Sequence, residues 1–209
     1  MMKTLLVFCL VVLMNCYGSP AYSLPLFSAV SIGGEEGVAL LGLDELPGGF
    51  QELPRVLLRP VGGRVEQLAG VLEEGGWQGG EVFVYFHPRR LELVLGMVGW
   101  VEDVGRFDAY LERFDDPVQR GDFWGNLAGK MGGARVSWEG YEYRRDLRGV
   151  GDRSTGMNVS LNLVHQGFEG EVLLFRRDRQ AVLLVVLNPE DRWPQVRVKA
   201  IATQLLHKL

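Results

Sequence analysis

Hydrophobic and polar positions alternate with a period of two over much of the C-terminal half. In residues 157–164, apolar side chains alternate with Asn and Ser, as in a half-buried antiparallel strand. Residues 81–87 and 91–101 are rich in β-branched, aromatic and aliphatic residues and are separated by a turn at Pro88, which predicts an antiparallel pair. We expect further strands over 134–143, 171–175 and 181–187, the last two forming a β-hairpin.

Other segments follow the period of a helix. Val104, Phe107, Leu111 and Phe114 lie on one face of a predicted helix. Further helices are expected over 118–131, over 194–209 beginning at Pro194, and, interrupted by proline and glycine, over 55–72.

Glycine-rich segments separate these elements. We expect a short strand or turn over 38–50 and a flexible link over 75–80. The predicted order of elements favours an α+β fold in which helices flank an antiparallel β-sheet. No segment resembles a linker long enough to require two domains, so residues 24–209 are interpreted as a single domain.

The N-terminus has the pattern of a secretory signal peptide. Lys3 precedes a continuous apolar run that is too short to span a bilayer stably, and small residues follow, with Ala21 and Ser23 as the best cleavage pair. We therefore interpret residues 1–23 as a signal peptide and expect export to the periplasm or the thylakoid lumen. A weaker alternative is lipidation at Cys16, because Met14 and Asn15 stand where lipoproteins carry small residues.

Composition restricts the function further. The chain has 209 residues, 22 Lys and Arg, 26 Asp and Glu, and a net charge of −4, which argues against general nucleic-acid binding. Both cysteines, Cys9 and Cys16, lie in the predicted signal, so ordinary cleavage would leave no thiol for a disulfide, for thiolate catalysis or for cysteine-ligated zinc.

The densest glycine loop is the best candidate for an interaction site. Residues 149–156 lack the lysine of a phosphate-binding loop and lead into a predicted strand, which favours a tight turn. Several arginines converge on it if the 171–187 hairpin lies alongside. The candidate interaction residues are Gly149, Gly151, Asp152, Ser154, Gly156, Arg176 and Arg177.

Candidate catalytic and metal-binding groups are sparse. The three histidines have no partner at metal-ligand spacing and are interpreted as polar residues of the surface or of strand ends: His87, His165 and His207. The acidic pairs 102–103 and 115–116 are interpreted as helix-end carboxylates. Arginines from 144 to 179 alternate with acids, which indicates a mutually compensated, solvated face.

Four stretches carry a resemblance to a known family. They are LLGLDELPGGFQEL at 40–53, RFDAYL at 106–111, GVGDRSTG at 149–156 and EVLLFRRDRQAVLLVVL at 171–187. With these stretches the chain resembles a family of exported, uncharacterised cyanobacterial proteins, and its last part resembles PsbP-like proteins, the extrinsic subunits and assembly factors of the photosynthetic lumen. The resemblance implies an α/β/α sandwich built on an antiparallel sheet and carries over no catalytic residue.

We therefore expect a non-enzymatic exported module, without cofactor or metal, that binds or helps to assemble a membrane protein complex such as photosystem II. The alternatives are a small-molecule or lipid binder that uses a cleft between sheet and helices, and a hydrolase built on Ser154 and His165.

Overall fold

The computed structural model describes residues 41–53, 70–123, 136–163 and 166–209. The expected signal peptide, Cys16, His165 and most of the helix expected over 55–72 lie outside these residues. Residues 117–123 are helical, and the rest of the helix expected up to residue 131 also lies outside. Among the described residues, no helix is both long and apolar enough to cross a bilayer.

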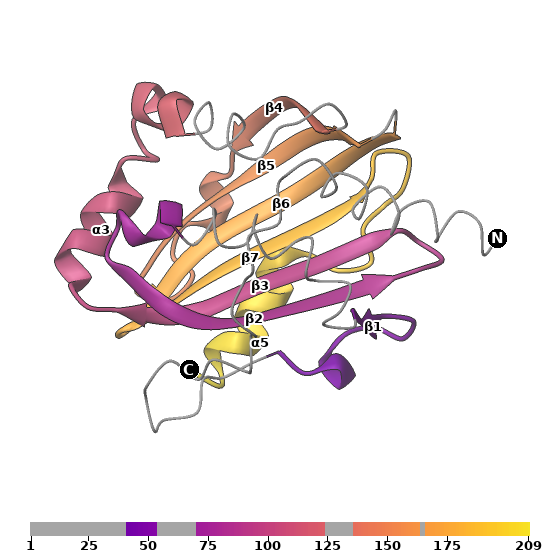
Figure 1. Cartoon of the computed structure of the whole chain (residues 1–209), viewed down its shortest axis with the longest axis horizontal. Coiled ribbons are helices and arrows are strands. Elements are labelled where there is room, and N and C mark those ends of the chain that lie inside the picture. The colour runs from indigo at the N-terminus through magenta and orange to yellow at the C-terminus, as the bar shows by residue number, and fades with distance from the viewer. Residues whose placement is uncertain (1–40, 54–69, 124–135, 164–165) are drawn as a thin grey trace, which may run out of the picture.

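The described strands form one antiparallel sheet (Figure 1) in the order β1-β2-β3-β7-β6-β5-β4. The strands are β1 (Gln51–Glu52), β2 (Trp77–His87), β3 (Glu92–Val101), β4 (Val136–Tyr143), β5 (Arg153–Leu163), β6 (Gln166–Arg177) and β7 (Gln180–Pro189). Besides the helical residues 70–73 and 117–123, the helical elements are η1 (Leu43–Glu45), α3 (Val104–Glu112), η2 (Arg145–Leu147) and α5 (Val198–Leu206). The expected α+β fold with an antiparallel sheet is confirmed, including the pairs β2–β3 and β6–β7.

The expected link over 75–80 is wrong in its second half, because β2 begins at Trp77. Trp77 pairs with Val101, and the register shifts between Gln78 and Glu81. Gly80 has a φ of +152°, and a Cβ atom there would lie 2.0 Å from the carbonyl oxygen of Val98. The glycines therefore form a β-bulge that lets the strand continue, and they do not end it.

The C-terminal helix begins later than predicted. α5 starts at Val198 with Arg197 as its N-cap, so Pro194 lies outside the helix. The backbone N–H groups of Gln195 and Val196 donate to the side chain of Glu92, which holds this stretch outside the helix. The predicted apolar stripe of α5 is confirmed by the burial of Val198, Ile201, Ala202 and Leu205.

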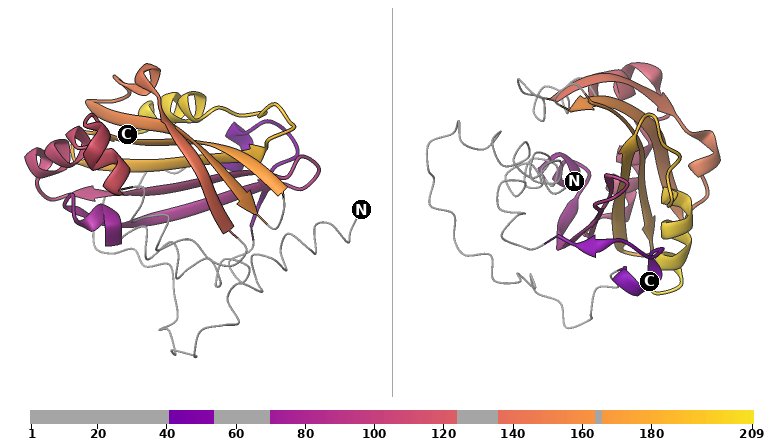
Figure 2. Two further views of the ribbon diagram at one scale, coloured as in Figure 1. Left: turned by 90° about the horizontal axis from the view of Figure 1, so that it is seen from above. Right: turned by 90° about the vertical axis from the view of Figure 1, so that its right-hand side faces the viewer.

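The sheet has an apolar core on each face. α5, η1 and the segment around Phe50 pack on one face, against residues such as Leu173 and Val182. α3 packs on the other, against residues such as Met97 and Leu183. Figure 2 shows that the sheet curves, with α5 on its convex side.

Antiparallel topology also defines two ends of the sheet. β3 and β6 run toward the end where α3 lies, and β2 and β7 run toward the opposite end, where the 88–91 turn and residues 190–197 follow them (Figure 1). We refer to the α3 end and the Trp193 end.

Candidate functional site

The glycine loop and the β6–β7 hairpin meet at the α3 end, which is the condition under which the sequence analysis expected arginines to converge on the loop. The N–H of Asp152 donates to the carbonyl oxygen of Arg176 at 2.9 Å. Gly151 has a φ of +65°, and a Cβ atom there would lie 2.3 Å from the same carbonyl oxygen. Glycine is therefore required at position 151 both by its backbone conformation and by this close approach.

Arg176 fastens α3 to the sheet. Its Nε and Nη2 atoms donate to the two carboxylate oxygens of Asp108 on α3, each at 2.6 Å, and Nη1 donates to Asp152 at 3.0 Å. These bonds, first those to Asp108, raise the pKa of the Arg176 guanidinium. The side chain is buried, and two carboxylates already bind its charge.

Asp152 also stabilises the turn between β6 and β7. Asp178, the first residue of this turn, has a φ of +52°. Its N–H donates to the Asp152 carboxylate at 2.7 Å. An Asp residue tolerates the left-handed conformation better than most side chains, so this turn forms without glycine.

Ser154 and Gly156 lie inside β5, because the strand begins at Arg153 and the predicted loop ends earlier than expected. The Ser154 hydroxyl accepts from the N–H of Val150 at 3.0 Å and donates to the carbonyl oxygen of Leu147 at 2.9 Å. A Cβ atom at Gly156 would lie 2.5 Å from the Leu147 side chain. Both residues therefore hold the 147–150 segment against the sheet.

The two remaining candidate residues, Gly149 and Arg177, form no hydrogen bond with the other members of the candidate site in the described structure. Gly149 has a φ of +81°, with open space where a Cβ atom would stand. Arg177 donates to the carbonyl oxygen of Leu206 and so binds the C-terminal end of α5.

Four arginines between 144 and 179 pair with acids, as predicted: Arg144, Arg148, Arg153 and Arg176. Arg177 and Arg179 donate instead to backbone carbonyl oxygens. Arg144 forms a bidentate pair with Asp146, with both bonds at 2.7 Å, and also donates to Glu171 at 3.1 Å. The Glu171 carboxylate in turn accepts from the N–H of Val198 at 3.0 Å and so satisfies an unbonded donor of the first turn of α5. Arg144, Asp146 and Glu171 therefore form a network of mutually satisfied charges beside the first turn of α5, which we call the compensated face.

The acidic pairs occupy helix ends, as predicted. Asp103 is the N-cap of α3 and accepts from the N–H of Arg106 at 3.0 Å. Asp116 accepts from the N–H of Val118 at 2.8 Å at the start of the 117–123 helix. Among the described residues, no group of three or more His, Cys, Asp or Glu side chains could hold a metal ion.

His87 lies at a strand end, the last position of β2, which is one of the two expected places for the histidines, but it is buried. Its side chain is 7% exposed and packs edge-on against the ring of Phe50, with ring centroids 5.3 Å apart. The end of β2 is covered by the segment that leads into β1, which removes His87 from solvent.

A different surface stands out at the Trp193 end. Trp193 lies between β7 and α5 and is 83% exposed, the highest value among the large apolar side chains in the described part of the chain. Arg89 and Arg192 are exposed near it, as are Glu190 and Asp191. We call residues 190–195 the Trp193 loop. An exposed indole with arginine beside it is the composition that concentrates binding energy in protein interfaces.

The Trp193 loop is held by hydrogen bonds to the 88–91 turn. Arg90 Nη2 donates to the carbonyl oxygen of Trp193 at 2.5 Å, and Arg192 Nη1 donates to the carbonyl oxygen of Arg89 at 2.9 Å. Asn188 Nδ2 donates to the carbonyl oxygen of Arg192 at 2.8 Å. Bonds from both sides of the loop therefore fix the backbone on either side of the indole.

Glu92 anchors the following residues from beneath. This carboxylate is 1% exposed and accepts from the N–H of Gln195 at 2.9 Å and of Val196 at 2.9 Å. Arg90 Nε lies 3.4 Å from it, close enough for an ion pair. Leu91, which precedes Glu92, has a φ of +57°, an unusual conformation for leucine that the surrounding bonds maintain.

Sequence reasoning missed Trp193, although a signal was present. The stretch Asp191-Arg192-Trp193-Pro194-Gln195 places one large aromatic residue among polar ones, outside every apolar stripe and next to a proline. A tryptophan in such a position is expected in a loop and not in the core.

Comparison with known proteins leaves the family open. No family model and no curated protein matches the chain. Among solved structures, the extracellular domain of PknH from Mycobacterium tuberculosis is similar with a TM-score of 0.43 and 14% sequence identity, over 66% of this chain and 68% of that chain. A likeness of that size is too distant to assign a fold, a family or an activity to this chain.

Proposed function

We propose that this chain is an exported accessory module that binds a membrane protein complex, such as a photosynthetic one, through the Trp193 loop. The exposure of Trp193, on a backbone fixed from two sides, is the observation that carries the proposal. An indole presented in advance on a fixed loop loses little conformational entropy when it enters a partner's pocket.

The charges around Trp193 favour a protein partner over an anionic lipid surface. Arg89 and Arg192 are accompanied by the exposed acids Glu190 and Asp191, so the surface is mixed in charge. Anionic lipid surfaces attract clusters of cations, whereas polar residues of both signs around a central aromatic side chain are usual at protein interfaces. The pattern of residues 1–23 supports export to the periplasm or the thylakoid lumen.

We also propose that the arrangement corresponds to the α/β/α sandwich of PsbP-like proteins. The placement of α5 and α3 on opposite faces of the sheet supports this proposal.

The test is capture from detergent-solubilised membranes of the source organism, with the tagged protein as bait. We expect Trp193→Ala to weaken binding of the captured complex at least tenfold, since truncating an interface anchor of this type costs about 2 kcal/mol or more. Unfolding free energy should stay within about 0.5 kcal/mol of wild type, because the side chain is exposed.

Val118→Ala is the matched control, because Val118 is an apolar residue that is 71% exposed at the α3 end. This variant should capture as much partner as the wild type. Equal capture by Trp193→Ala would refute the role of the loop, and binding to phosphatidylglycerol vesicles in place of a protein would replace the proposed partner with a lipid surface.

A further inference from the structure

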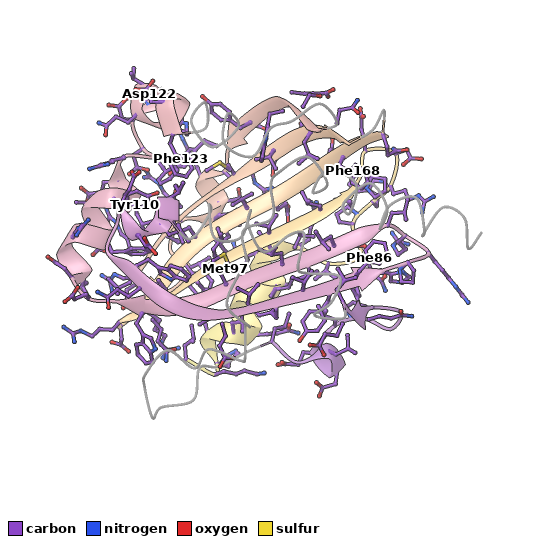
Figure 3. All side chains as sticks on the ribbon, in the orientation of Figure 1. Phe86, Met97, Tyr110, Asp122, Phe123 and Phe168 are labelled. Atoms are coloured by element: carbon purple, nitrogen blue, oxygen red, sulfur yellow. The ribbon has the colours of Figure 1, made fainter. Side chains whose placement is uncertain are left out.

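The Trp193 loop has two different neighbours at its end of the sheet. On one side lies the 88–91 turn, which joins β2 to β3, and on the other side, across β7, lies the start of β6. In Figure 3, Phe86 of β2 marks the first side and Phe168 of β6 marks the second. The charged residues near Trp193 can therefore be assigned to one side or the other.

The cations gather on the side of the 88–91 turn. Arg89 and Arg90 belong to this turn, and Arg192 reaches it, because its Nη1 atom donates to the carbonyl oxygen of Arg89 at 2.9 Å. Arg90 in turn donates to the carbonyl oxygen of Trp193 at 2.5 Å. These bonds bring three arginines to the same side of the indole's backbone.

The exposed acids are placed differently. The N–H of Glu190 donates to the carbonyl oxygen of Gly167 at 3.0 Å, and a Cβ atom at Gly167 would overlap the Glu190 carboxylate, which therefore lies over the start of β6. β3 and β6 are two strand spacings apart, about 10 Å, which is about one Debye length at 0.1 M salt. Glu190 thus does little to neutralise the turn, and Asp191, 73% exposed, lies 4.0 Å from Arg192 alone.

Arg89 is the cation with the most charge to offer. Arg90 has Glu92 at 3.4 Å and Arg192 has Asp191 at 4.0 Å, whereas no acid in the described parts of the chain pairs with Arg89. The N–H groups of residues 90 and 91 both donate to the carbonyl oxygen of residue 87, which places Arg89 at the tip of a tight, exposed turn. A guanidinium in this position is free to bind a carboxylate through two parallel hydrogen bonds.

We infer that the partner of the Trp193 loop is a protein whose pocket for the indole has a carboxylate on the side that faces the 88–91 turn, and that Arg89 binds this carboxylate. The inference rests on the proposed function, because it names the chemistry of the partner at the same site. The indole supplies most of the affinity, and Arg89 selects among apolar pockets by their charge. A flat anionic membrane would also face the exposed Glu190 and Asp191 and would repel them.

The test uses the purified complex that the tagged protein captures and measures its binding kinetics with each variant. At about 0.05 M salt, we expect Arg89→Gln to weaken binding about threefold and Arg89→Glu at least about tenfold, mainly through slower association, because charges at the rim of an interface steer the encounter. At about 0.5 M salt, the two variants should differ by less than about twofold, because exposed charges are screened.

Arg145→Glu is the matched control. Arg145 is an exposed arginine of η2 at the α3 end, so this variant makes the same change of net charge away from the Trp193 loop and should bind like the wild type. Vesicles of phosphatidylglycerol form a second arm. Binding of the wild type to them, lost in Arg89→Glu, would assign the anion to a lipid phosphate and overturn the inference.

The outcomes separate this inference from the proposed function, and capture of a complex does not by itself support it. If Trp193→Ala weakens binding but Arg89→Glu and Arg89→Gln bind like the wild type, the proposed function stands and the carboxylate is wrong. If Trp193→Ala also binds like the wild type, both fail. Urea denaturation checks that Arg89→Glu is folded; if it is not, Arg89→Gln, which removes the charge but keeps a polar side chain, decides the question.

Discussion

The two ends of the sheet carry similar residues but use them differently. At the α3 end, Arg176 binds the carboxylates of Asp108 and Asp152, so charge meets charge. At the Trp193 end, Arg90 and Arg192 donate to backbone carbonyl oxygens. The first arrangement closes a packing contact between a helix and the sheet, and the second shapes a loop whose most prominent side chain remains in solvent.

The difference shows that the partner of an arginine at a turn decides whether its charge remains available to another molecule. A guanidinium paired with two carboxylates has little left to offer a partner, whereas one that holds a backbone carbonyl keeps its net charge. Arg192 has Asp191 at 4.0 Å, and Arg90 has Glu92 at 3.4 Å, both longer than the 2.6 Å bonds of Arg176 to Asp108. The Trp193 end is thus the better candidate for contact with another molecule.

Removing Glu92 should have the largest effect. Glu92→Ala leaves the N–H groups of Gln195 and Val196 without their acceptor, and we expect a loss of about 3 kcal/mol in unfolding free energy, measured by urea denaturation. The amides of 195 and 196 should also exchange faster with solvent deuterium.

Glu92→Gln is the matched control for this change. It keeps one acceptor oxygen in nearly the same shape, so its loss should be clearly smaller. A loss below about 0.5 kcal/mol for Glu92→Ala would mean that the Trp193 loop is held by its arginines alone.

Breaking the α3 contact should cost somewhat less. Arg176→Ala removes a buried guanidinium but leaves Asp108 and Asp152, which are 29% and 47% exposed and can be hydrated. We therefore expect a loss of about 2 kcal/mol, below the range for a fully buried pair. The unfolding midpoint in urea measures it.

Arg177→Ala should change stability by no more than about 0.5 kcal/mol, since this exposed neighbour bonds to one backbone carbonyl. If both variants lost the same amount, the carboxylate pairing of Arg176 would not be what distinguishes the α3 end. Partner capture through the Trp193 loop should survive Arg176→Ala as long as the chain folds.

The strands and helices were easier to predict from the sequence than the partners of the polar side chains. Alternation over 157–164 identifies β5, because burial on one face imposes a period of two on the sequence. The sequence analysis missed the true start of β5 at Arg153, because the glycines up to Gly156 are typical of a loop. Gly156 is in fact a strand residue that makes room for the side chain of Leu147, and this contact outside the strand leaves no local pattern in the sequence.

In the candidate site, too, the contacts between residues far apart in the sequence could not be predicted. Proximity of Arg176 to the glycine loop was only a condition in the sequence analysis, because it depends on how β5 and β6 pair. Its partner Asp108 is 68 residues away and has no local signal beyond one polar position on a helix. Long-range pairing of charges depends on the packed structure, and so does the burial of His87.

The smallest predicted effect concerns pH and the compensated face beside α5. The bidentate bonds from Arg144 lower the pKa of Asp146 from 3.8 to about 2. Because the pKa is lower in the folded state, the pair stabilises the fold above pH 4, and this contribution disappears as the pH falls from about 4 to about 2.

Asp146 is 54% exposed, so solvent screening keeps the contribution below about 1 kcal/mol. Asp146→Asn should therefore lower stability slightly at pH 7, match the wild type at pH 2, and give a shallower acid limb in urea titrations. If stability fell as steeply with acid in Asp146→Asn as in the wild type, the stabilising partner of Arg144 would be Glu171 and not Asp146.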